Sequence, residues 1–107
     1  MSQFDDRERA FETKFARDDE MAFRVTARRN KLVGQWAAGL MKLTPEETAS
    51  YATAVVQADF EEAGDDDVVR KVLGDLTAAA CDVDETAVRQ AIADKTIEAR
   101  RQLMESQ

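Results

Sequence analysis

The fold is decided by residues 44–69, which read TPEETASYATAVVQADFEEAGDDDVV. Thr44 predicts a helix N-cap, and Pro45 suits the first helical position because the missing N–H is not needed there. Glu47 stands three residues after the cap and completes a capping box. Gly64 accepts the left-handed conformation in which many helices end. The stretch therefore predicts one whole helix between these two signals.

The other helices follow on either side of this stretch. The acids at 65–67 suit the N-terminus of a helix, whose dipole favours negative charge, and either Asp82 or Asp84 caps a later helix. We expect four helices, at about 19–42, 45–63, 66–80 and 84–104. No segment alternates apolar and polar residues as a half-buried strand does, so the chain is predicted to be all-α. Connections of a few residues favour antiparallel neighbours and hence a four-helix bundle.

Apolar residues at helical spacing give the expected core. Its members are Val25, Leu32, Trp36, Leu40, Leu43, Tyr51, Val55, Phe60, Val69, Val72, Leu76, Val88, Ile92 and Leu103.

The N-terminal segment is too long for this bundle. No proline interrupts residues 4–42, which as one helix would span roughly 58 Å, whereas the other helices reach about 25 to 33 Å at 1.5 Å per residue. Residues 1–18 must therefore overhang as a helical extension, fold back or be disordered. We divide the chain into this extension (residues 1–18) and a bundle (residues 19–107).

Composition limits the chemistry of the chain. The 107 residues carry a net charge of −7, so affinity for nucleic acid is not expected, and no apolar run approaches the length that crosses a membrane. The chain has no histidine, which removes the commonest general base and the commonest transition-metal ligand. The N-terminus lacks the basic start and apolar run of a signal peptide, and the single Cys81 forms no internal disulfide, so we expect a cytoplasmic protein. No nucleophile is paired with a base and no phosphate loop is found, so an enzyme is not expected. The acids at 59–67 lack the spacing of a calcium loop, and no metal site is predicted.

The extension combines dense charge with aromatic side chains. Phe4, Phe11 and Phe15 are seven and four residues apart, which places them on one helical face. One interpretation is a frayed, solvated terminus. The other is a segment that becomes ordered on a partner, with the aromatic residues as anchors and the charges setting register. In the second interpretation the partner-binding residues are Phe4, Asp5, Arg7, Glu8, Arg9, Phe11, Glu12, Lys14 and Phe15.

A cationic segment follows the extension. It contains Arg24, Arg28, Arg29 and Lys31, with no acid among them, and Trp36 lies close by in sequence. Guanidinium groups bind phosphate in a bidentate manner, and an indole offers a surface on which a base stacks. These five residues are the candidate nucleotide site. The alternative is that the charges only pair with acids of the bundle.

The residues at 4–12, 14–16, 27–32, 34, 36–38 and 59–68 together resemble the zeta subunit of alphaproteobacterial ATP synthases. The resemblance implies a four-helix bundle with a mobile N-terminal extension. It also implies that the chain inhibits ATP hydrolysis by inserting that extension at an interface between catalytic subunits of the soluble head. No cofactor is required, although ADP or ATP is implied as a regulatory ligand of the bundle. The alternative function is a nucleotide-binding regulatory or adaptor module without strong inhibitory activity.

Overall fold

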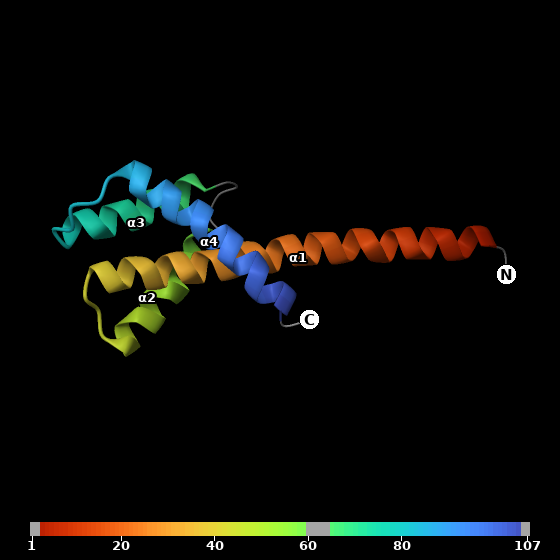
Figure 1. Cartoon of the computed structure of the whole chain (residues 1–107), viewed down its shortest axis with the longest axis horizontal. Helices are drawn as coiled ribbons and strands as arrows, with labels where there is room; N and C mark the ends of the chain where they lie inside the picture. Colours follow the sequence, from red (N-terminus) through yellow and green to blue (C-terminus); the bar gives the residue numbers. More distant parts are fainter. Residues whose placement is uncertain (1–2, 60–64, 106–107) are drawn as a thin grey trace.

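The computed structural model describes residues 3–59 and 65–105, and in this part of the chain it contains four helices and no strand (Figure 1). They are α1 (Gln3–Leu40), α2 (Pro45–Ala58), α3 (Asp66–Ala78) and α4 (Glu85–Glu105). The predicted all-α fold is confirmed.

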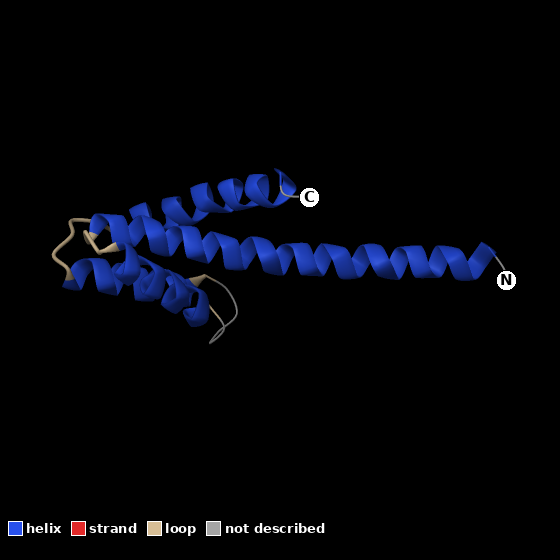
Figure 2. Cartoon of the chain, turned by 90° about the horizontal axis from the view of Figure 1, so that it is seen from below, coloured by secondary structure: helices blue, strands red, loops and turns tan. Residues whose placement is uncertain are grey.

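Helix α1 is the central helix, and the other three helices contact it. Helices α2 and α4 pack mainly against α1, and α3 contacts all three of the others. The N-terminal part of α1 runs straight on beyond the ends of the other helices, as both views show (Figures 1 and 2). The chain is therefore elongated, with principal extents of 65 × 26 × 20 Å. Of the three alternatives for the segment before the bundle, the structure adopts the helical one over residues 3–18.

The core lies where α1, α3 and α4 meet and is closed on the other side by α2. Its central cluster consists of Val33, Ala37, Val55, Val68, Val69, Val72, Leu76, Val88 and Ile92, with Trp36 and Tyr51 packed against it. Most predicted core residues are buried or half-buried. The prediction that Leu40 belongs to the core is wrong, because α1 ends at this residue and Leu40 is 41% exposed. Phe60 lies outside the described residues.

The capping signals decide where helices begin. The Thr44 capping box is confirmed: Glu47 N donates to Thr44 Oγ1 at 3.2 Å, and Thr44 N donates to Glu47 Oε1 at 2.9 Å. The hydrogen bond from the backbone N–H of Thr44 to the ionised carboxylate is the main cause that lowers the pKa of Glu47. Of the two aspartates before α4, Asp84 is the cap, since its Oδ1 accepts from Ala87 N at 2.8 Å.

Two helix ends use left-handed residues that are not glycine. Lys42 after α1 has φ of 59° and Ala80 after α3 has φ of 61°. Each belongs to a Schellman motif, in which Leu43 N donates to Ala38 O at 3.0 Å and Cys81 N donates to Leu76 O at 2.9 Å. As a result α1 and α3 each end two residues before the predicted position, at Leu40 and Ala78.

Helix α2 also ends earlier than predicted. Its last residue is Ala58, and Asp59 is the C-cap. Acidic side chains are unfavourable at a helix C-terminus, and Asp59 instead approaches Arg29, with 4.0 Å between Oδ1 and Nη2. The rest of the predicted span and its stop signal, Gly64, lie outside the described residues.

Gly34 sets the distance between α1 and α2. A Cβ atom at this position would lie 2.7 Å from the Cα atom of Ala52. We expect Gly34→Ala to lower the free energy of unfolding by about 1–3 kcal/mol, because the backbones must separate. Gly39→Ala is the matched control, since no atom lies within 4 Å of its added Cβ, and it should stabilise α1 by up to about 1 kcal/mol. Urea denaturation followed by circular dichroism would compare them, and equal stabilities would contradict the close approach.

Candidate partner-binding surface

The extension continues α1 without a break, so the register of its positions follows from the helix itself. At about 100° per residue, positions 4, 11 and 15 fall within about 20° of the direction of positions 29 and 33. Arg29 and Val33 are buried in the bundle. The aromatic positions therefore lie on the continuation of the face that α1 turns toward the core. The side chains of the nine predicted partner-binding residues, between Phe4 and Phe15, lie outside the part described.

Three members of the cationic segment lie at the surface. Arg24 Nη2 pairs with Glu20 Oε1 at 2.6 Å, with both side chains more than half exposed. Arg28 Nη1 donates to Gln102 Oε1 of α4 at 3.3 Å. Lys31 is exposed on the side of α1 that borders α2, where it lines a shallow hollow with Gln35.

The fourth member, Arg29, is buried. Its Nη1 atom pairs with Asp65 Oδ1 at 2.9 Å, and Asp59 is the more distant acid on the same guanidinium. Its Nε and Nη2 atoms donate to Oδ1 of the buried Asn30 at 3.1 and 2.8 Å. Asp59 and Asp65 flank residues 60–64, so Arg29 ties both ends of the α2–α3 connection to α1. Its charge is largely occupied by these partners.

The five predicted nucleotide-site residues do not line one cavity. Trp36 is half-buried and packs against the core. Of the five, Arg29 lines a hollow together with two cations of α4, Arg89 and Arg100, and this hollow has a volume of about 530 Å³. The remaining lining residues of this hollow are Asp65, Ile92, Ala93, Thr96 and Ile97.

Arg89 and Arg100 were missed by the sequence reasoning. They are eleven residues apart, which is three turns of α4, and so share one face of that helix. This spacing can be recognised in the sequence. Nothing in the sequence links this face to Arg29 on α1. Arg89 Nη2 donates to Asp66 Oδ1 at 3.2 Å, and chiefly this hydrogen bond raises the pKa of Arg89.

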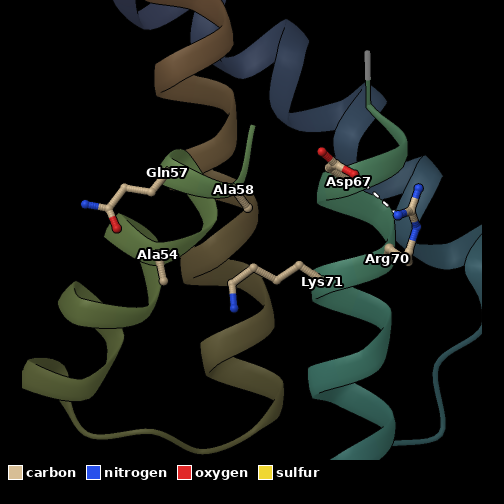
Figure 3. A pocket seen from close by; sticks show the side chains of 6 residues that line it. All are labelled: Ala54, Gln57, Ala58, Asp67, Arg70 and Lys71. Carbon is tan, nitrogen blue, oxygen red and sulfur yellow. Dashed lines mark ion pairs between the residues drawn. The ribbon is translucent and has the colours of Figure 1, made fainter. Parts of the chain in front are cut away.

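A second hollow, of about 470 Å³, opens between α2 and α3 (Figure 3). Figure 3 shows Asp67 and Arg70 on the α3 side, with 3.5 Å between Oδ1 and Nη1, and Lys71 lying across toward α2. Asp67 Oδ2 is buried without a hydrogen-bond partner. Lys71 Nζ lies 3.1 Å from Asp75 Oδ2. None of the predicted site residues lines this hollow.

Tyr51 links α2 to α3. Its hydroxyl donates to Asp75 Oδ2 at 2.8 Å, and burial together with this hydrogen bond raises the pKa of Tyr51 well above its ordinary value. Within residues 3–59 and 65–105, no group of three or more Cys, Asp or Glu side chains is placed to hold a metal ion. In the same part of the chain, no helix is long and apolar enough to cross a membrane.

These features define a small all-α bundle from which a single helix projects. The chain belongs to the ATPase inhibitor subunit zeta family, whose model matches residues 1–102. It is also similar to a protein solved by solution NMR, with 45% sequence identity and a TM-score of 0.73, over 81% of this chain and 99% of the other. Among curated proteins no match is found. Membership in this family supports a regulatory role as an inhibitor that interacts with ATP synthase.

Proposed function

We propose that this chain inhibits ATP hydrolysis by an F-type ATP synthase by inserting residues 1–18 at an interface between catalytic subunits of the soluble head. The observation that carries the proposal is the straight projection of α1 beyond the bundle, on a segment with three phenylalanines at spacings of seven and four (Figure 1). A projecting helix with one aromatic face suits insertion between two subunits, because it offers apolar anchors on a narrow element.

In this proposal, charged residues of the extension orient its helix at the interface. Asp5, Glu8, Arg9 and Lys14 would form charge pairs that set the register of the helix in its cleft. The bundle, at 26 × 20 Å across its shorter axes, is much wider than one helix and stays outside as a holder. Such an inhibitor acts by occupying space and needs no catalytic residue. The chain would act in the cytoplasm, held at the inner membrane through the synthase.

The direct test is to titrate the full chain into the purified soluble head and to follow ATP hydrolysis. We expect hydrolysis to fall and the effect to saturate near one chain per head. Unchanged hydrolysis at an excess of the chain, with binding demonstrated on the same sample, would refute the inhibitory role.

The hollow beside Arg29 supports a second function, the sensing of ADP or ATP by the bundle. Arg29, Arg89 and Arg100 offer guanidinium groups to phosphate, and Ile97 offers an apolar surface to a base. Arg24, Arg28, Lys31 and Trp36 do not line this hollow and have no direct part in this arrangement.

Trp36 fluorescence during titration with ADP and ATP tests this second function. We expect Arg100→Gln to weaken the nucleotide response about tenfold, because a charged hydrogen bond is worth roughly 1.5–3 kcal/mol. Arg101→Gln is the control, since Arg101 is exposed on α4 and does not line the hollow. The absence of any response in the unmodified chain at millimolar nucleotide would refute sensing.

A further inference from the structure

Asp65 places its own carboxylate in the hollow beside Arg29. It lines this hollow together with Arg29, Arg89 and Arg100, and its Oδ1 atom lies 2.9 Å from Arg29 Nη1. A carboxylate oxygen and a phosphate oxygen accept the same kind of charge-assisted hydrogen bond from a guanidinium group. Asp65 therefore stands where a bound phosphate would contact Arg29.

The other nitrogen atoms of Arg29 are held within α1. Nε and Nη2 both donate to Oδ1 of Asn30, which is buried and is the next residue of the same helix. The side chain of Arg29 is only 9% exposed, whereas that of Asp65 is 47% exposed. A phosphate group that enters the hollow consequently reaches Nη1 by taking the place of Asp65.

The two arginines of α4 differ in their partners. Arg89 pairs with Asp66 at 3.2 Å and lies 3.6 Å from Glu85. Arg100 is exposed and forms no ion pair within the part of the chain whose side chains are described. Its uncompensated charge attracts an anion into the hollow, where the anion then meets the pair of Arg29 with Asp65.

Asp65 has another hydrogen-bonding position when it leaves Arg29. It is the N-cap residue of α3, but its side chain makes no capping hydrogen bond, and its backbone has φ of −95° and ψ of −6°. Thr44, whose side chain does cap α2, has ψ of 163°. A rotation about ψ would let Asp65 accept from an N–H group in the first turn of α3, as an aspartate at an N-cap ordinarily does. This hydrogen bond would offset part of the loss of the contact with Arg29.

We propose that Asp65 is an intramolecular competitor of the phosphate ligand and sets the affinity of the hollow for ADP or ATP. The proposal rests on the proposed sensing function, because it concerns the same hollow. In the free chain Asp65 neutralises Arg29. In the bound chain a phosphate oxygen accepts from Arg29 Nη1, and Asp65 leaves it. Asp65 thereby holds the affinity below the value that the three arginines alone would give.

The test is the variant Asp65→Asn, which removes the charge at nearly constant volume. Asparagine is as good an N-cap as aspartate, so α3 should keep its start, and Asp65→Ser is a second variant with a good N-cap and a shorter side chain. The control is Asp94→Asn, which changes the net charge equally. Asp94 is exposed on α4, accepts from Gln90 Nε2 at 3.0 Å and does not line the hollow.

ADP and adenosine are each titrated into the full-length chains, and binding is measured by calorimetry. Melting curves confirm that each variant is folded. We expect both Asp65 variants to bind ADP about tenfold more tightly than the unmodified chain, because a competing charged hydrogen bond is removed, and Asp94→Asn to stay within about twofold. Adenosine has no phosphate group, so the substitutions at Asp65 should bring no gain in its affinity.

The outcomes separate this competition from nucleotide sensing itself. If the Asp65 variants bind ADP no more tightly than the unmodified chain, or if Asp94→Asn or adenosine shows the same gain, the competition is overturned and sensing stands. ADP binding by the Asp65 variants alone would support the competition and refute sensing by the unmodified chain. No binding of ADP by any of these chains would overturn both.

Discussion

Deletion of residues 2–18 should abolish inhibition, raising the concentration needed for half-inhibition by more than about 100-fold. Interface aromatic anchors commonly contribute more than 1 kcal/mol each, and a loss of roughly 2.7 kcal/mol already weakens binding 100-fold. The extension carries three of them, Phe4, Phe11 and Phe15. The bundle should keep its melting temperature within a few degrees, because the projecting part of α1 lies beyond the other helices (Figure 2). ATP hydrolysis and thermal denaturation of the truncated chain are the measurements.

A control that preserves composition tests whether inhibition depends on the aromatic face of the extension or only on its length and charge. Exchange of Phe11 and Thr13 moves one anchor to the opposite side of the helix, since two positions differ by about 200°. We expect this exchange to weaken inhibition about tenfold without changing the net charge. Inhibition that survives the deletion would place the inhibitory surface in the bundle and contradict the role of the extension.

Arg29→Ala should destabilise the bundle by about 2–4 kcal/mol. Removing one partner of a buried ion pair commonly costs 3–5 kcal/mol, and the expected value is somewhat lower because Asp65 is 47% exposed. The substitution leaves Asp59, at the end of α2, without its cation and removes the donors that satisfy the buried Asn30. Urea denaturation of the full chain, followed by circular dichroism, measures the loss.

Arg24→Ala is the matched control for this substitution. Arg24 and Glu20 form a shorter ion pair, but both side chains are more than half exposed, so the loss should stay below about 1 kcal/mol. Arg29→Met retains an unbranched apolar side chain and should recover part of the stability lost in Arg29→Ala. Equal effects of Arg24→Ala and Arg29→Ala would show that Arg29 does not hold the α2–α3 connection.

Local signals in the sequence predicted the helices well where a side chain determines the backbone. Thr44 with Glu47 specifies a helix start that the structure reproduces, because both hydrogen bonds are formed within four residues. The ends of α1 and α3 were less predictable. Lys42 and Ala80 adopt the left-handed conformation that glycine usually adopts at a helix C-terminus. Neither residue type is typical of this position, so the sequence does not indicate where these two helices end.

The properties of Arg29 could not be predicted from its own neighbourhood. In the sequence it is one of four cations in a short run, and its burial depends on Asp59 and Asp65, which only the fold brings to it. The same holds for the hollow that it shares with Arg89 and Arg100, since those residues come from α4. The aromatic positions of the extension are different, because one continuous helix fixes their relative directions from spacing alone.

Amide hydrogen exchange over residues 3–18, measured with and without the ATP synthase head, tests the central claim most directly. In the free chain we expect fast exchange there, because a helix without tertiary contacts is marginal in water. On binding, protection of these amides should rise by about 100-fold or more, while amides in the middle of α2 and α3 change little. Protection that appears only in the bundle, with residues 3–18 exchanging as fast as before, would contradict insertion of the extension.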